Sequence, residues 1–221
     1  MQAEADGVGA GANFGLTWRI TERHRLAFTC RTPVRIDYNG DFRVNNVPGS
    51  LGGGTMGSGF KTSIKFPTIL AVGYGIELRD RIRLETDVEW LQFSNFKNLP
   101  LNSVAAAGLG FPSSVPENWR DTFTAGIGGD WKFAPDWILR AGYQFYQSPV
   151  PDSTFSPTIP DANQNVPTVG LGYTHNRHSI EAAYGIDFYN ERNIRNAQNS
   201  AFNGKYQNTV HLFSFAYHYS F

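Results

Sequence analysis

The stretch from residue 82 to residue 90 reads Ile-Arg-Leu-Glu-Thr-Asp-Val-Glu-Trp. The odd positions from Arg83 to Glu89 are all charged, and the even positions are apolar apart from Thr86. Successive side chains of a strand point to opposite faces, whereas a helix would spread these charges around its surface. The stretch therefore predicts a β-strand with one charged face and one apolar face.

The same two-residue alternation recurs on both sides of this stretch, between clusters rich in Gly, Pro, Asn and Asp. We expect nine strands, at about residues 11–20, 26–42, 64–78, 82–90, 122–133, 137–145, 169–173, 180–188 and 213–221. No segment of comparable length shows the helical period. The sequence therefore predicts an all-β chain, and its 221 residues fit one domain.

The connections between these strands alternate in length. We expect tight turns at 21–25, 79–81, 134–136 and 175–178, and long loops at 43–62, 97–118, 147–165 and 190–207. Short turns at one end and long loops at the other are typical of outer-membrane β-barrels, whose short turns lie in the periplasm.

Composition excludes several other classes of protein. Nineteen basic and nineteen acidic side chains cancel, so the chain has no electrostatic feature suited to nucleic acid. Cys30 is the single cysteine, which rules out a disulfide within the chain. No apolar run approaches the roughly 18 residues of a transmembrane helix, and residues 1–10 lack the features of a signal peptide.

The alternation alone fits a soluble lipid-binding barrel with its aromatic face inside, or a membrane barrel with that face towards lipid. Two features favour the membrane. The polar face mixes Gly with charges of both signs, as a wet lumen would, and aromatic residues recur near strand ends, as in interfacial girdles. These aromatic residues are Trp18, Tyr38, Trp90, Trp131 and Trp137.

Several motifs resemble one known family over essentially the whole chain. They are Arg25–Pro33, Lys65-Phe66-Pro67, Asn118-Trp119-Arg120-Asp121-Thr122, Trp137–Tyr143, Ser148-Pro149-Val150-Pro151-Asp152 and Ile159-Pro160-Asp161-Ala162. Together they are similar to the C-terminal half of the FadL/TodX family of long-chain fatty acid and hydrocarbon transporters. Cys30 departs from the usual Tyr of that family, and Asn163-Gln164-Asn165 stands where an Asp-Arg pair is common.

The resemblance implies a transmembrane antiparallel β-barrel of 14 strands with an N-terminal hatch. Nine strands are about two thirds of that number, and an odd number of antiparallel strands does not close on itself. We therefore expect residues 1–221 to be the C-terminal part of a single barrel domain. On this interpretation the signal peptide, hatch and first strands are missing, and Met1 is not the biological start.

The resemblance also implies a function. We expect passive uptake of hydrophobic compounds across the outer membrane of a Gram-negative bacterium, with long-chain fatty acids as the leading substrate and aromatic hydrocarbons as the alternative. Family members capture the molecule at extracellular loops and release it through the barrel wall, with no cofactor and no chemical step. Outer-membrane lipid is a further expected partner, as is the barrel assembly machinery, which would read the terminal Phe221.

Four cations on the polar face are candidate partners for a fatty carboxylate: Arg31, Arg35, Lys65 and Arg140. The competing interpretation is cross-strand ion pairing with the carboxylates of the same face. Those carboxylates are Glu77, Glu85, Asp87, Glu89 and Asp130.

A second candidate is the unusually apolar loop at 97–118. Leu99, Leu101 and Phe111 could line a capture groove, or they could simply pack against neighbouring loops.

Rival functions have weaker support. A hydrolase needs a nucleophile, a base and an orienting group within reach of one another. His24, His175 and His178 fall in predicted turns. His218 shares a face of the last predicted strand with Ser214 and Ser220, but only because residues an even number apart on a strand point to the same side. We predict no catalytic residue and no metal site. A nonspecific porin remains the nearest alternative channel.

Overall fold

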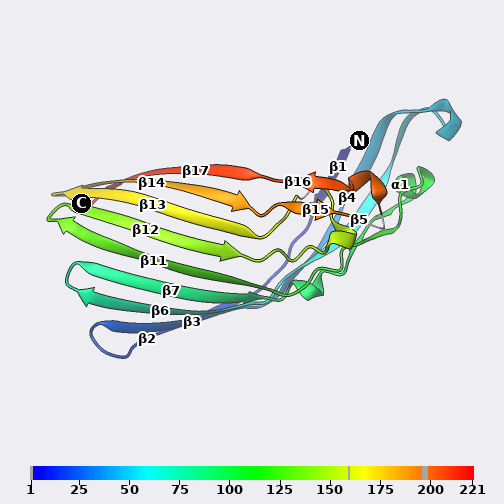
Figure 1. The fold of residues 1–221 in the computed structure, drawn as a ribbon. Helices are drawn as coiled ribbons and strands as arrows, with labels where there is room; N and C mark the ends of the chain where they lie inside the picture. The colour runs from blue at the N-terminus through cyan, green and yellow to red at the C-terminus, as the bar shows by residue number, and fades with distance from the viewer. Residues whose placement is uncertain (1, 159, 196–198) are drawn as a thin grey trace.

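The computed structural model describes residues 2–158, 160–195 and 199–221; Met1 and Ile159, both named above, lie outside the described residues. Its main body is a nine-stranded antiparallel sheet, as predicted, in which each strand pairs with its neighbours along the chain. The sheet curves into an open trough (Figure 1). Among the described residues, no helix has the length and apolar character required to cross a membrane.

The nine strands are β2 (Asn13–Arg19), β3 (His24–Arg31), β6 (Ile69–Arg79), β7 (Ile82–Leu91), β11 (Thr122–Ala134), β12 (Trp137–Tyr146), β13 (Gln164–His175), β14 (His178–Tyr189) and β17 (Thr209–Tyr219). Within the described residues, β2 and β17 are the two edges of the sheet and do not pair with each other. The structure is therefore a partial barrel.

Two predicted strands are each divided at a proline. The predicted strand 26–42 becomes β3 and β4 (Val34–Val47), and the predicted strand 64–78 becomes β5 (Gly54–Phe66) and β6. The pairing register continues across the break, from Arg31 opposite Ile69 to Val34 opposite Phe66. Pro33 and Pro67 lie between these pairs and have no N–H to donate, so the ladder is interrupted there.

The predicted loop at 43–62 is wrong. Most of these residues belong to a long β4–β5 hairpin that extends beyond the sheet, with its tip at the short helix η1 (Gly49–Leu51). The hairpin joins β1 (Gln2–Asp6) and β9 (Asn102–Ser103) in a second sheet, and α1 (Val104–Gly108) packs against it. We call these elements the β4–β5 lobe; it projects at the right of Figure 1.

The lobe has a small core of its own. Phe42 of β4 packs with Ala105 and Ala106 of α1, and partly buried Val44, Met56, Phe60 and Leu109 surround them. Ser103 caps α1, because its Oγ accepts a hydrogen bond from the Ala106 N–H at 3.2 Å.

The remaining loops contain short elements. These are η2 (Phe93–Asn95), β8 (Asn98–Pro100), β10 (Ser114–Pro116), η3 (Asp152–Thr154), β15 (Arg192–Ile194), η4 (Ser200–Phe202) and β16 (Gly204–Tyr206). β8 pairs with β10, and β15 pairs with β16.

The Ser-Pro-Val-Pro-Asp motif holds a loop arginine. The Arg192 guanidinium donates hydrogen bonds to the carbonyl oxygens of Asp161, at 2.9 Å, and Val150, at 3.0 Å. It also pairs with the Asp152 carboxylate and lies over the Phe155 ring, 5.1 Å from the ring centroid. One side chain thereby fastens the loop after β12 to the loop after β14.

The two ends of the trough differ as the sequence predicts. The hairpin turns β2–β3, β6–β7, β11–β12 and β13–β14 lie at one end with the C-terminus, and the lobe and long loops lie at the other (Figure 1). The β13–β14 turn is tight because Asn176 adopts a left-handed φ of 53°.

Candidate functional site

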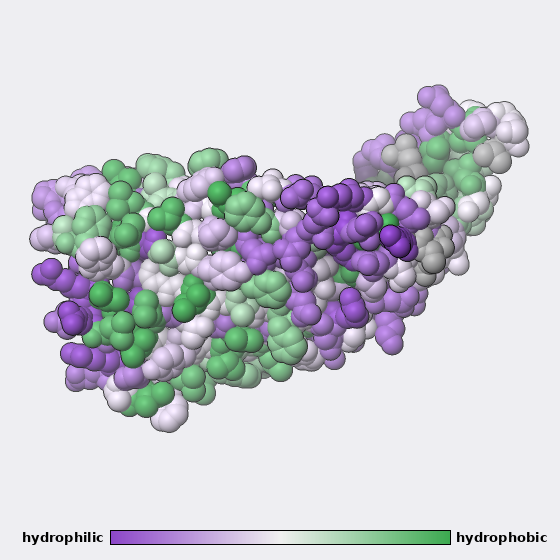
Figure 2. All heavy atoms as spheres, in the orientation of Figure 1, coloured by the Kyte–Doolittle hydropathy of each residue, from purple (hydrophilic) through white to green (hydrophobic). Residues whose placement is uncertain are grey.

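The outer surface of the trough is apolar. Phe213 is 81% exposed, Phe215 73% and Ile127 60%, whereas Thr122 and Thr124 on the opposite face are 1% and 5% exposed. A barrel folded in water would cover the aromatic side chains and expose the threonines. Figure 2 shows the apolar band over the strands, with polar surface at the turn end and over the loops. This inverted exposure indicates that the outer face contacts lipid.

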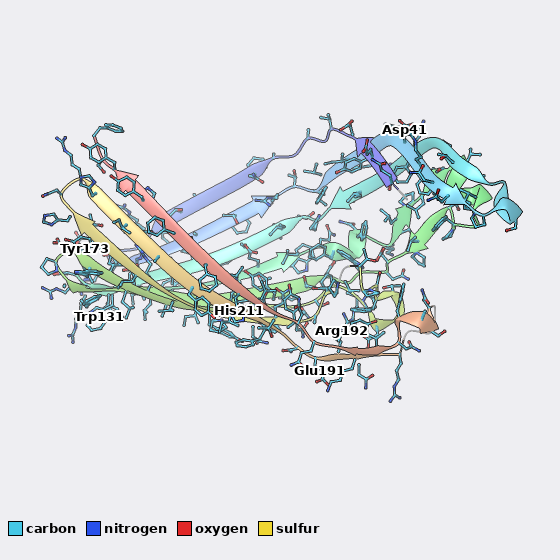
Figure 3. The ribbon with its side chains drawn as sticks, turned by 90° about the horizontal axis from the view of Figure 1, so that it is seen from above. Asp41, Trp131, Tyr173, Glu191, Arg192 and His211 are labelled. Carbon is cyan, nitrogen blue, oxygen red and sulfur yellow. The ribbon has the colours of Figure 1, made fainter. Side chains whose placement is uncertain are left out.

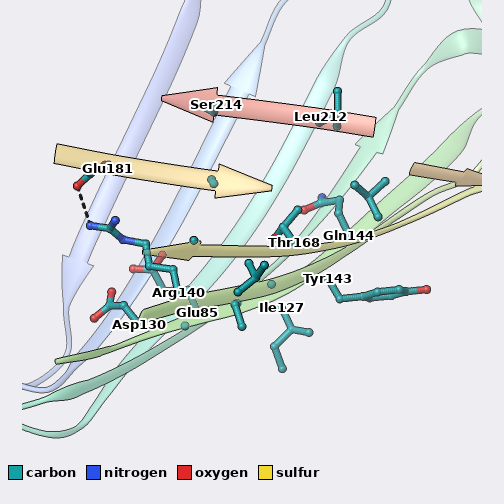
Figure 4. Close-up of a pocket in the computed structure, with 18 of the residues that line it drawn as sticks. Glu85, Ile127, Asp130, Arg140, Tyr143, Gln144, Thr168, Glu181, Leu212 and Ser214 are labelled. Atoms are coloured by element: carbon teal, nitrogen blue, oxygen red, sulfur yellow. Dashed lines mark hydrogen bonds and ion pairs between the residues drawn. The ribbon is translucent and has the colours of Figure 1, made fainter. Parts of the chain in front are cut away.

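The inner surface is polar and hollowed. A cavity of about 680 Å³ lies along β7, β11, β12, β13, β14 and β17. Charged side chains in its wall include Arg83. Glu85, Asp130, Arg140 and Glu181 also line it and are labelled in Figure 4. We call this inner face the lumen.

An ion-pair belt crosses the lumen. Its pairs are Arg25 with Glu77 at 2.9 Å, Arg83 with Asp130 at 2.8 Å, and Arg140 with Glu181 at 3.0 Å. The ladder places Glu77 opposite Arg83, Arg83 opposite Asp130, and Asp130 opposite Arg140, so the charges alternate in sign from strand to strand. These side chains are only partly covered, so each pair is worth about 0.2–1 kcal/mol and the belt is chiefly a charge-neutral surface.

Of the four candidate cations, Arg140 belongs to this belt, close to the turn end. The other three lie at the base of the lobe. Arg31 donates from Nε to Asn13 Oδ1 at 3.2 Å, and Arg35 donates from Nε to Asp37 Oδ1 at 3.0 Å. Lys65 is the ladder partner of Arg35 and takes part in none of the ion pairs found among the described residues. Arg35 and Lys65 are therefore direct ladder neighbours, and Arg31 lies four residues before Arg35 along the chain.

Asp37, in the lobe, is held in its charged form. A hydrogen bond from Ser63 and a second from Arg35 lower the pKa of the Asp37 carboxyl below its ordinary value. Arg35 therefore already has an anionic neighbour, whereas Lys65 and Arg31 have no carboxylate partner among the ion pairs of the described residues.

The three apolar candidates lie on or beside the lobe. Leu99, in β8, is the ladder partner of Val115, and the Leu101 N–H donates to the Ser113 carbonyl at 2.8 Å. The Phe111 ring meets the Phe42 ring edge-on, with centroids 6.2 Å apart, and stays 42% exposed. Packing against neighbouring segments, the second interpretation given above, is present; ligand contact stays a prediction.

Sequence reasoning missed two charged residues that organise the structure. Glu181 alternates with Ile180 and Ala182, so the strand period could have placed it in the lumen as the partner of Arg140. Arg192 falls in a loop with no periodic signal, and only the folded structure shows its partners.

Four of the five histidines contact a carboxylate or a tyrosine hydroxyl, and His175 Nδ1 lies 3.2 Å from Asp136 Oδ2. His24 bonds the Tyr74 hydroxyl at 2.6 Å, His178 bonds that of Tyr217 at 2.8 Å, and His211 bonds that of Tyr184 at 2.8 Å. Figure 3 shows His211 and Tyr173 among the side chains of the strands. No group of three or more His, Cys, Asp or Glu side chains suited to a metal ion occurs in the part of the chain that the structure describes.

Known proteins resemble this chain in sequence and in fold. A long-chain fatty acid transport protein of Escherichia coli O6:H1 is 25% identical over 183 residues, covering 78% of this chain and 40% of that protein. The crystal structure of a Pseudomonas aeruginosa FadL homologue matches with a TM-score of 0.79 at 25% identity, covering 95% of this chain and 52% of the other. The toluene transporter TodX of Pseudomonas putida matches with a TM-score of 0.63 at 18% identity, covering 96% of this chain and 49% of the other.

The chain thus spans about half the length of these relatives. A family described as outer membrane protein transport protein (OMPP1/FadL/TodX) matches residues 1–221. Its members lie in the outer membrane of Gram-negative bacteria, which agrees with the apolar outer face and with the short turns at one end. The chain belongs to the OMPP1/FadL/TodX family of outer-membrane transport proteins.

Proposed function

We propose that this chain contributes wall and extracellular loops to a channel for the passive uptake of hydrophobic compounds, and that long-chain fatty acids are its principal substrates. The observation that carries the proposal is the β4–β5 lobe, which holds an apolar cluster beyond the lipid-facing wall with cations at its base. A fatty acid has the same two parts, an apolar chain and an anionic head.

The lobe supplies a surface for first contact. Leu99, Leu101 and Phe111 are apolar and lie on the loop side of the wall, where no lipid covers them. Transfer of an alkyl chain from water onto such a surface is favourable by roughly 25 cal/mol for each Å² removed from water. These three residues are the proposed capture surface.

The cations at the base of the lobe would hold the head group. Lys65 and Arg31 have no carboxylate partner among the described ion pairs, so either can donate a charge-assisted hydrogen bond to a fatty carboxylate. Arg35 shares this position but is already paired with Asp37. Arg140 lies further along the lumen, where it would first have to leave Glu181.

The proposed activity needs neither catalytic residues nor a cofactor, since the substrate is unchanged by passage. Outer-membrane lipid would cover the apolar face. Phe221 follows the last strand and is fully exposed, so it is accessible to the barrel assembly machinery, the remaining proposed partner.

Aromatic hydrocarbons are the alternative substrates. The fold is shared with a toluene transporter, and the Phe42–Phe111 contact would suit a small aromatic ring as well as an alkyl chain.

A binding titration tests these proposals. The complete product of the gene, purified in detergent, is titrated with a labelled long-chain fatty acid and, separately, with a labelled monoaromatic hydrocarbon. Saturable micromolar or tighter binding of the acid supports the first assignment, and weakening by both Phe111→Ala and Lys65→Gln supports the proposed site. Saturable binding of the monoaromatic alone would replace fatty acids by hydrocarbons; ion conductance without binding of either would favour a porin.

A further inference from the structure

The lipid-facing side of the sheet has a groove over β7, β11 and β12, in the half of these strands next to the turns. Its volume is about 410 Å³, and apolar side chains of the outer face line it. Two of them, Ile127 and Tyr143, point away from Gln144 and Thr168 of the lumen in Figure 4. We call it the outer groove, since it lies on the opposite side of the sheet from the lumen.

The outer groove follows from the sizes of neighbouring side chains. Gly129 of β11 and Ala141 of β12 are ladder partners, and residues two positions away along each strand share their face of the sheet. Those residues are large on both sides of the small pair: Ile127 opposite Tyr143, and Trp131 opposite Leu139. Two small residues therefore form the floor, and the larger pairs form the two ends.

The outer groove spans the thickness of about one membrane leaflet. From Trp131 to Ile127 the strand advances four residues, which is about 13 Å along the strand and about 10 Å across the membrane at a tilt near 40°. Half of the apolar band is about 12 Å. Trp131 also begins a row of aromatic rings, continued by Phe133, Trp137 and Tyr173, with successive centroids 4.7–6.4 Å apart. Such a row marks the interface at the turn end, so the groove lies in the periplasmic leaflet.

An unpaired cation flanks the interfacial end of the outer groove. Ladder partners have their side chains on the same side of the sheet, and the register places Arg79 opposite Ile82 and Ile82 opposite Trp131. Arg79 is thus two strands from Trp131, or about 10 Å. It is exposed and takes part in none of the ion pairs among the described residues. The adjoining turn adds Arg81 and Asp80, so a positive charge remains in excess.

We propose that the outer groove binds one phospholipid of the periplasmic leaflet, with an acyl chain over Ala141 and the phosphate on Arg79. A phospholipid has an apolar chain one leaflet long below an anionic phosphate, which is the order of the groove and the cation along the membrane normal. An arginine is well suited to phosphate, because its guanidinium can donate two parallel hydrogen bonds. The site concerns the outer face and does not depend on which substrate the lumen carries.

The test uses the complete product of the gene in detergent, titrated with a phospholipid and with a diacylglycerol of the same chains, and bound lipid is counted by native mass spectrometry. Ala141→Phe fills the groove and should weaken both lipids about tenfold, the contact of roughly two methylene groups. Ala125→Phe is the matched control, because Ala125 faces lipid further along β11 and does not line the groove; it should change neither affinity.

The head-group part of the site has its own variant. Arg79→Gln should weaken the phospholipid about fivefold and leave the diacylglycerol unchanged. Arg177→Gln removes a cation from the β13–β14 turn at the same end of the sheet and should leave both affinities as in the parent.

Three results would overturn the proposal. They are equal effects of Ala141→Phe and Ala125→Phe, an equal loss of both lipids in Arg79→Gln, and a protein dimer that Ala141→Phe dissociates, which would assign the groove to a second copy of the chain. Displacement of the phospholipid by a long-chain fatty acid would also overturn it, by making the groove a substrate site. Failure of the complete protein to bind fatty acid in the lumen would refute the proposed function and leave this site standing.

Discussion

Ile127 provides the sharpest test of which face of the sheet contacts lipid. It lies in β11 midway between Phe123 and Trp131, both on the apolar face, and is 60% exposed. Placed there, a lysine would lie near the middle of the apolar band. The expected cost of Ile127→Lys is about 2–4 kcal/mol of unfolding free energy, or roughly a 30- to 900-fold shift in the folding equilibrium.

Gln144→Lys is the matched control. Gln144 lies in the adjacent strand opposite Gly126, one residue from the pairing of Ile127 with Tyr143, but it faces the lumen. A lysine there stays in a polar cavity that also contains Asp87, so we expect a change below about 1 kcal/mol. Denaturant unfolding of both variants in lipid vesicles, followed by tryptophan fluorescence, measures the difference. Equal stability of the two variants would refute the assignment of the outer face to lipid.

Three further predictions concern single interactions. A double-mutant cycle on Arg140→Gln and Glu181→Gln should give a coupling of about 0.2–1 kcal/mol in unfolding free energy, and a coupling of zero would mean that the belt pair is not formed. Arg192→Ala should leave buried loop carbonyls unpaired, cost about 1–3 kcal/mol locally and speed proteolysis of the loops, whereas retention of protease resistance would contradict its fastening role. Burial raises the pKa of the Glu117 carboxyl, although a hydrogen bond from Trp119 opposes this, so the loop should lose stability as pH rises through that pKa. Proteolysis of the loop at a series of pH values measures this, and Glu117→Gln should remove the pH dependence. An unchanged pH profile in that variant would exclude Glu117 as its source.

The strand period carried most of the fold prediction. All nine strands of the main sheet appear where alternation placed them, because lipid on one side and water on the other impose the same two-residue period on every strand. The tight turns were predictable because each falls between two alternating segments, and in the β13–β14 turn Asn176 is a residue type that tolerates the positive φ found there.

The β4–β5 lobe was not predictable in the same way. One face of the hairpin packs against α1, but residues 54–59 read Gly-Thr-Met-Gly-Ser-Gly, so the sequence there shows no clean apolar alternation and was taken for a loop. The prolines at positions 33 and 67 signalled the break within two strands, but the alternation on either side concealed it.

The candidate site was only partly accessible from sequence. The alternation of side chains along the strand placed Arg140 on the lumen face, and cross-strand ion pairing was expected there. Its partner Glu181 could not be identified, because it lies 41 residues away and only the register of β12, β13 and β14 brings the two side chains together.

Uptake by living cells is the most direct test of the proposed function. The complete product of the gene is expressed in a Gram-negative host whose own long-chain fatty acid carrier has been deleted, and entry of a labelled long-chain fatty acid is followed with time. We predict that uptake and growth on the fatty acid are restored, and that they fall when Phe111 or Lys65 is replaced. Correct outer-membrane insertion with no uptake, or uptake only of small hydrophilic solutes, would contradict a channel for hydrophobic compounds.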